Sequence, residues 1–99
     1  PFFETVNDPQ VKSEFFNYGA DTFCRLGKLE EATSLAQQAR DADPDSHLPY
    51  FMLGAINQVK SDYPAAQRDL EHSLTLRSDV PIVHQFLERT KRAADLLAH

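Results

Sequence analysis

The chain has 99 residues, of which 41% are hydrophobic and 25% are charged. This composition is too apolar for a disordered segment. No apolar run approaches the roughly 18–20 residues that cross a bilayer, so we expect one soluble domain without membrane insertion. The formal net charge of −5 argues against general nucleic-acid binding, which needs a basic surface. Eleven Ala and eleven Leu residues, with only three Gly, favour helices throughout.

The acidic charge lies in the first half of the chain. Residues 1–50 hold nine acids and four bases, whereas residues 51–99 hold six of each. The single Cys excludes an internal disulfide and a thiolate zinc cluster. Because the chain begins at Pro1 rather than Met, we expect a processed product or a domain excised from a longer protein. The sequence does not assign a compartment, although cytoplasmic is favoured over periplasmic or secreted.

Capping residues and helix breakers predict five helices, at about residues 9–26, 29–42, 47–60, 63–77 and 80–98. The expected N-caps are Asp8, Ser46, Asp62 and Asp79, each of which can accept a backbone N–H with its side chain. Gly27 ends the first helix, and Asp43-Pro44 follows the second. Connections this short predict sequential antiparallel hairpins of helices.

The chain is similar to itself with a period of 34 residues, because residues 13–46 align with residues 47–80. The aligned pairs are Ala20 with Gly54, Leu29 with Tyr63, Ala32 with Ala66, Ala36 with Leu70, and Ala39 with Ser73. Small residues at these positions let paired helices approach closely. We expect Phe16, Phe23, Leu35, Leu53, Leu70 and Leu74 to fill the space around the crossings.

This period and pattern resemble the tetratricopeptide (TPR) repeat. The first copy runs from Phe16 through Ala20, Gly27 and Ala32 to Asp43-Pro44, and the second begins at Tyr50 and keeps the Leu53-Gly54 pair. The sequence departs from the family pattern at Gly19, Asn57, Ser61, Ser73 and Ser78. The resemblance implies an all-α fold of two helical hairpins, a TPR-like α-solenoid that is elongated rather than spherical.

The fifth predicted helix has one apolar side and one polar side that faces solvent. Its apolar side consists of Ile82, Val83, Phe86, Leu87, Thr90, Ala93, Ala94 and Leu97, with Leu96 as the one misplaced apolar residue. Glu88 stands where a third repeat would need a small residue. We therefore expect a terminal capping helix. The predicted organisation is an extension at 1–12, repeats at 13–46 and 47–80, and a cap at 81–99.

The sequence does not predict an enzyme, a metal site or a cofactor. Asp41, Asp43 and Asp45 resemble the opening of a calcium loop, but Ser46 and Met52 stand where that loop needs Gly and Glu. The four His residues lack zinc-ligand spacing. Cys24 has no local nucleophile signature, and we expect it to contribute packing.

In the TPR resemblance, the first helix of each hairpin lines a concave groove that binds partners. The positions carried over are Glu14, Asn17, Asp21 and Cys24 on the first helix, Leu48, Phe51, Ala55 and Gln58 on the third, and Ile82, Gln85, Arg89 and Arg92 on the cap. In this groove, the first helix would form an acidic wall, the third helix an apolar floor and the cap a basic wall. Alternatively, Leu48 and Phe51 pack against neighbours, and the charges are ordinary solvated surface.

The expected function is a non-enzymatic protein–protein interaction module, either a scaffold or assembly factor or the TPR part of a larger protein. It would bind a peptide or helix of a partner protein, with Phe51 contributing about 2 kcal/mol or more. Many chaperone-binding TPR domains hold a C-terminal carboxylate, and Asp21 would repel that ligand. Two alternatives stay open: a secretion-type chaperone that shields a partner helix, and a self-associating domain using Phe2, Phe3 or Leu96. Phe2 and Phe3 could also pack on their own first hairpin or belong to a frayed end.

Overall fold

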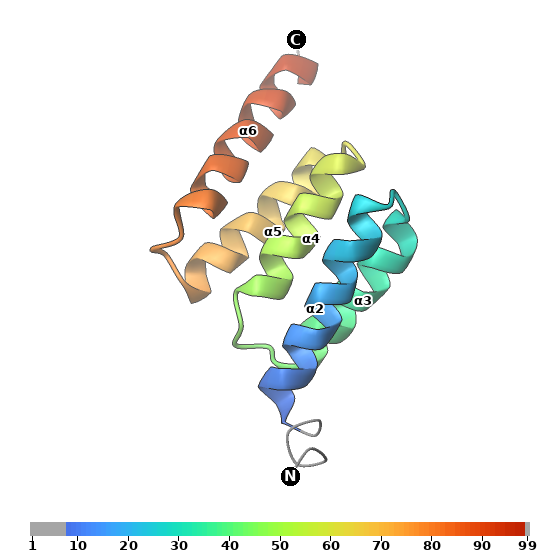
Figure 1. The fold of residues 1–99 in the computed structure, drawn as a ribbon. Coiled ribbons are helices and arrows are strands. Elements are labelled where there is room, and N and C mark those ends of the chain that lie inside the picture. Colours follow the sequence, from blue (N-terminus) through green and yellow to red (C-terminus); the bar gives the residue numbers. More distant parts are fainter. Residues whose placement is uncertain (1–7, 99) are drawn as a thin grey trace.

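The computed structural model describes residues 8–98, which form five α-helices joined by short connections (Figure 1). The helices are α2 (Pro9–Arg25), α3 (Leu29–Ala42), α4 (Leu48–Val59), α5 (Tyr63–Leu76) and α6 (Pro81–Ala98). Residues 8–98 contain no strand, so the all-α prediction is confirmed. The described part measures 56 × 29 × 18 Å, which confirms the expected elongated shape.

Two of the four predicted N-caps act as expected. The carboxylate of Asp8 accepts hydrogen bonds from the backbone N–H groups of Gln10, at 2.8 Å, and Val11, at 3.4 Å. The carboxylate of Asp62 accepts from the N–H of Ala65 at 3.3 Å. Both helices also begin with proline in the first turn, where its missing N–H costs nothing. These caps fix where α2 and α5 start.

The predicted caps Ser46 and Asp79 were wrong. The N-cap of α4 is His47, so α4 begins one residue later than predicted, although the Ser46 hydroxyl accepts a hydrogen bond from the N–H of Leu48 at 3.3 Å. The Asp79 carboxylate instead accepts a hydrogen bond from the Arg77 guanidinium at 3.1 Å. The carbonyl before Pro81 takes the first helical hydrogen bonds, so α6 begins one residue later than predicted.

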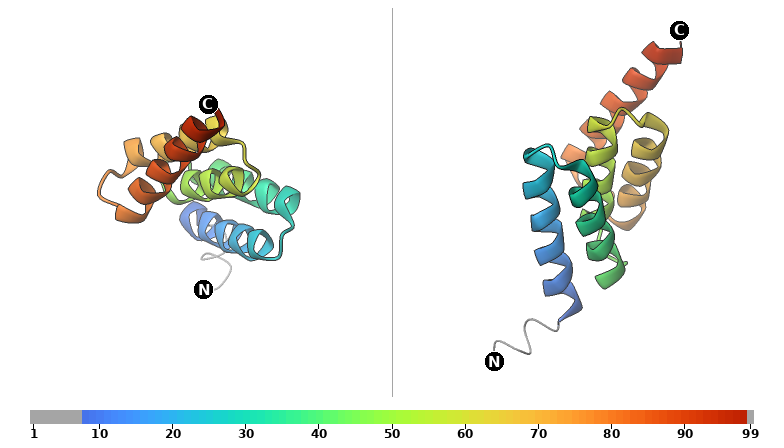
Figure 2. Two further views of the ribbon diagram at one scale, coloured as in Figure 1. Left: turned by 90° about the horizontal axis from the view of Figure 1, so that it is seen from above. Right: turned by 90° about the vertical axis from the view of Figure 1, so that its right-hand side faces the viewer.

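The helices pack in sequence as two hairpins followed by α6. In Figure 2, α2 lies against α3, α4 against α5, and α6 against α5. The hairpin crossings use small residues as predicted: Ala20, Ala32 and Ala36 are fully buried between α2 and α3. Gly54 on α4 lies so close to α5 that a Cβ there would be 2.6 Å from the Leu70 Cγ. Close approach at these positions sets the spacing of each pair.

The second hairpin repeats features of the first in the predicted register. Helix α5 has 14 residues, like α3, and begins and ends 34 positions after it. Gly27 and Ser61 are also 34 positions apart, and both have a positive φ, of 79° and 64° respectively. Each ends its helix in the left-handed conformation that usually requires Gly. The arrangement is therefore helical and repeat-like.

Helix α6 covers the end of the second hairpin with only part of its length. Val83, Leu87 and Thr90 are buried, and Val83 and Leu87 form a core cluster with Leu70. Figures 1 and 2 show the C-terminal end of α6 projecting beyond α4 and α5. Leu97 is therefore 73% exposed, although the sequence placed it on the packed side of the helix.

Candidate functional site

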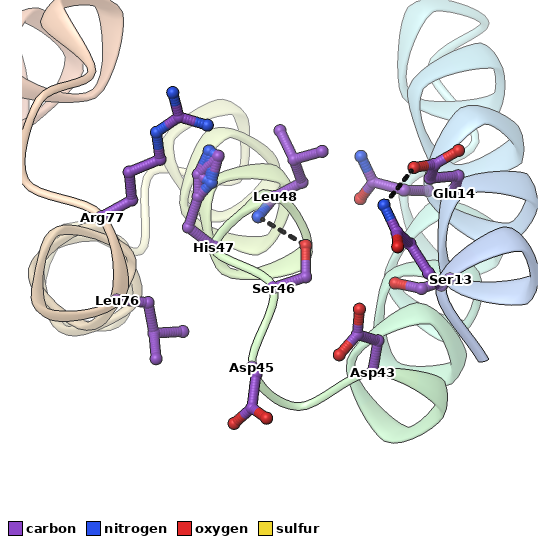
Figure 3. A pocket seen from close by; sticks show the side chains of 11 residues that line it. Ser13, Glu14, Asp43, Asp45, Ser46, His47, Leu48, Leu76 and Arg77 are labelled. Atoms are coloured by element: carbon purple, nitrogen blue, oxygen red, sulfur yellow. Dashed lines mark hydrogen bonds between the residues drawn. The ribbon is translucent and has the colours of Figure 1, made fainter.

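A surface hollow lies where the first turns of α2 face the start of α4 (Figure 3). We call it the α2–α4 hollow, and its volume is about 430 Å³. It is lined by Gln10, Ser13, Glu14, Asn17, Asp43, Asp45, Ser46, His47, Leu48, Leu76 and Arg77. In Figure 3, Ser13 and Glu14 on α2 face His47 and Arg77 across the space, and Leu48 lies between them. Its walls thus come from three helices and the α3–α4 connection.

The charges of the α2–α4 hollow are more acidic than basic. Glu14, Asp43 and Asp45 contribute three carboxylates. Burial, assisted by the positive charge of Arg77, lowers the pKa of His47 below its ordinary value, while Asp79 acts in the opposite direction. His47 is therefore neutral at neutral pH, which leaves Arg77 as the one cation of the lining. The Arg77 guanidinium is already bonded to Asp79 at 3.1 Å.

Asn17 on the wall of this hollow carries a buried polar atom without a partner. Its Oδ1 is enclosed by protein and accepts no hydrogen bond from residues 8–98. A buried carbonyl left unsatisfied costs about 1–3 kcal/mol, and most such groups in proteins are paired.

Six of the predicted groove residues line two surface hollows. Glu14, Asn17 and Leu48 meet in the α2–α4 hollow. Gln85, Arg89 and Arg92 line a shallower hollow of about 340 Å³ on α6, together with His84 and Glu88. The expected acidic and basic ends thus lie on different helices. Ala55 is half-buried and Ile82 is 43% exposed, and neither lines these two hollows.

Two residues predicted to line the groove contact α6 from α4. The ring of Phe51 packs edge-on against that of Phe86, with ring centroids 5.2 Å apart and an interplanar angle of 88°. The Gln58 side-chain amide donates to the buried Thr90 hydroxyl at 3.2 Å. Phe51 is half-buried beside the Leu70 cluster. These contacts are internal, so removing either side chain would also loosen α6.

Asp21 and Cys24 also make contacts within α2 or its hairpin. The Asp21 carboxylate forms an ion pair with Arg25, one turn later, at 3.1 Å. Cys24 packs beside the core cluster around Ala20 and Leu53. Burial, together with the negative charge of Asp21, raises the pKa of the Cys24 thiol, while Arg25 acts in the opposite direction. The thiol therefore stays protonated at neutral pH, in keeping with a packing role.

Ser73 and Asn57, which depart from the TPR pattern, form hydrogen bonds that the sequence alignment could not reveal. The fully buried hydroxyl of Ser73 donates to the His47 carbonyl at 3.0 Å, which ties α5 to the start of α4. The Asn57 amide donates to the Asp69 carboxylate at 2.8 Å. Burial raises the pKa of Asp69, although the Asn57 hydrogen bond and nearby cations oppose this shift. Both polar pairs join α4 and α5 where apolar residues would otherwise pack.

Helix α2 carries an exposed apolar surface that was not predicted from the sequence. Phe15, Tyr18 and Leu26 are 74%, 76% and 65% exposed, more than the predicted surface residue Ile82. The signal was present in the sequence, because these residues share the side of α2 opposite the one carrying Ala20. The predicted contacts of Phe2 and Phe3 lie outside the described residues.

No protein-family model matches the chain, and a search of curated proteins finds no significant relative. Within residues 8–98, no group of three or more His, Cys, Asp or Glu side chains is arranged to hold a metal ion. Over the same range, no helix combines the length and the apolar character needed to span a bilayer. The functional assignment therefore depends on the geometry of the surface.

Proposed function

We propose that this protein is a non-enzymatic interaction module built from two TPR-like hairpins and a capping helix, which binds a peptide or helix of a partner protein. The repeat-like register of α3 and α5 supports the family resemblance. The left-handed residues Gly27 and Ser61, which occupy corresponding positions, support it as well. Helical repeats commonly function through extended surfaces rather than through chemistry at one point.

The α2–α4 hollow is the observation that carries the proposal. It combines carboxylates and amide groups with the partly exposed side chains of Leu48 and Leu76, which are 41% and 38% exposed. An apolar surface next to a few polar groups suits recognition of a peptide segment, because burial supplies affinity and the polar groups supply orientation. The bound segment would place basic groups near Glu14 and acidic groups near Arg89 on α6.

The test is affinity capture followed by quantitative mass spectrometry, with variants compared in parallel. Glu14→Lys combined with Leu48→Asp changes the charge and the apolar contact of the hollow at two exposed positions. Arg89→Glu tests the α6 end. Each variant should reduce capture of the same partner by about tenfold or more, as expected for contacts of 1.4 kcal/mol or above. Circular dichroism would check that each variant remains helical.

Arg68→Glu is the matched control for Arg89→Glu. Arg68 is also an exposed Arg, but it lies on α5, and its reversal changes the net charge equally. It should retain the partner. If Arg68→Glu loses the partner while the hollow variants and Arg89→Glu keep it, the binding surface lies on α3 and α5, and this proposal is wrong.

A further inference from the structure

The outer side of α2 carries an apolar stripe, which we call the α2 stripe, formed by Phe15, Tyr18, Thr22 and Leu26. These residues follow one another at intervals of three or four positions, which places them on one side of a helix. Phe15 and Tyr18 are each about three-quarters exposed, at 74% and 76%. A contiguous exposed patch of large apolar side chains typically marks an interaction surface.

The α2 stripe also contains a hollow that fits a side chain from a facing helix. The hollow has a volume of about 350 Å³ and is lined by Tyr18, Asp21, Thr22, Arg25 and Leu26. When two helices pack side by side, a side chain of one helix (a knob) inserts into a hole between four residues of the other. Such a hole is formed here by Tyr18, Asp21, Thr22 and Arg25. Phe15 lies just before this hole, so α2 presents a knob and a hole on the same side.

We propose that α2 pairs antiparallel with α2 of a second copy of this chain, across a twofold axis. The point midway between Tyr18 and Gly19 lies equally far along α2 from Phe15 and from Thr22. An antiparallel pairing about this point therefore places Phe15 of each copy at the hollow around Thr22 of the other. A twofold interface requires a self-complementary patch of this kind.

The charges beside the stripe suit the same pairing. Glu14 and Arg25 are eleven positions apart, about three helical turns, so they lie on the same side of α2 and towards opposite ends. The twofold axis brings Glu14 of each copy near Arg25 of the other. Arg25 already pairs with Asp21 at 3.1 Å, so it would bridge two carboxylates in the dimer. Association should weaken as salt increases.

The size of the patch predicts a weak dimer. Phe15, Tyr18 and Leu26 provide on the order of 400 Å² per copy, or about 800 Å² in total, which is below the roughly 1,200–2,000 Å² of a stable specific interface. The dimer should therefore be reversible and depend on concentration. Ser13 and Asn17, which line the α2–α4 hollow, lie on a different side of α2, so Glu14 is the residue that this pairing shares with the proposed partner site.

Sedimentation equilibrium of the full chain, from about 10 µM to about 1 mM, tests the proposal. We expect a reversible monomer–dimer equilibrium, and Phe15→Glu should lower the association constant at least about tenfold. Leu96→Glu is the matched control, because Leu96 is equally exposed, at 79%, on α6. It should leave the association constant unchanged. A protein that stays monomeric throughout, or one that loses dimerisation with Leu96→Glu only, would overturn the proposal.

A cross-link tests the geometry separately. In a Cys24→Ser background, Tyr18→Cys places a thiol close to the twofold axis in each copy, so mild oxidation should produce a disulfide-linked dimer. Gln38→Cys, on the exposed side of α3, should not cross-link under the same conditions. Equal cross-linking of the two variants, or none with Tyr18→Cys, contradicts the antiparallel α2 pairing.

Discussion

Individual polar side chains decide how α4 is held at its beginning. His47 caps α4, and its carbonyl accepts both the Phe51 N–H, at 3.1 Å, and the Ser73 hydroxyl, at 3.0 Å. The Ser73 hydroxyl is buried, so its hydrogen bond replaces one that water would otherwise supply. One carbonyl thus joins the start of α4 to α5, beside the α2–α4 hollow.

Ser73→Ala should reduce the free energy of unfolding by about 0.5–1.5 kcal/mol, the usual net value of one such hydrogen bond. Urea denaturation measures the change. Ser78→Ala, at an exposed position in the α5–α6 connection, is the matched control and should have little effect. Equal stability of the wild type and Ser73→Ala would show that this hydrogen bond does not hold α4 in place.

The pKa of His47, measured by NMR, should lie below 6.5 because of burial and the Arg77 charge. Since the folded pKa is lower than the unfolded one, the unfolded chain binds more protons between the two values. Stability is complete above about pH 6.5 and falls as the pH drops towards the folded pKa. Arg77→Gln should raise the pKa of His47, and Asp79→Asn should lower it. The opposite order would show that the two side chains do not act on His47 as described.

At the level of whole helices, sequence periodicity was sufficient for α3, which packs against both α2 and α4. The limits of α3 agree with the prediction at both ends, and Ala32 and Ala36 are buried as expected. Periodicity identifies the residues that share a side, but not whether another helix covers that side. Leu97 is exposed because the end of α6 extends beyond the neighbouring helices. Phe15 is exposed because it lies on the side of α2 that faces away from the other helices.

The two helical glycines provide a test of helix spacing. In Gly54→Ala, the new Cβ would lie 2.6 Å from Cγ and 2.7 Å from Cδ2 of Leu70, so the α4–α5 hairpin must shift at a cost of about 1–3 kcal/mol. In Gly19→Ala, the Cβ would lie 3.1 Å from the flexible end of Leu35. A gain in helix propensity of up to about 1 kcal/mol can offset that contact. Thermal unfolding should therefore rank Gly54→Ala well below Gly19→Ala, and the reverse order would contradict the packing.

The Asp69–Asn57 pair between α4 and α5 predicts a second pH effect, with the opposite sign. Burial raises the folded pKa of Asp69 above 3.8, so the folded chain binds more protons and stability falls as the pH rises through that window. Asp69→Asn keeps an oxygen that accepts from Asn57 and removes the charge. This variant should become more stable relative to the wild type between pH 4 and pH 7. The control Asp95→Asn, at an exposed position on α6, should not. A loss for Asp69→Asn over that range would contradict this interpretation.

For the whole molecule, the proposed binding surface extends over helices from both hairpins and the cap. The sequence resemblance supplied Glu14, Asn17 and Leu48, which the fold brings together in one hollow. It could not supply His47, Leu76 and Arg77, because His47 lies in the connection before α4, and Leu76 and Arg77 lie at the end of α5. Nor could it show that Phe51 and Gln58 pack against α6, since repeat alignment does not distinguish an open groove from a filled one.

The most direct test of the central proposal is an NMR map of the binding surface. Amide chemical shifts of the 99-residue chain would be followed while the captured partner segment is titrated in. The proposal predicts that the largest changes fall on the α2–α4 hollow, around Glu14, Asn17 and Leu48, and continue to Gln85 and Arg89 on α6. Changes concentrated on the outer sides of α3 and α5, with the hollow unaffected, would contradict it.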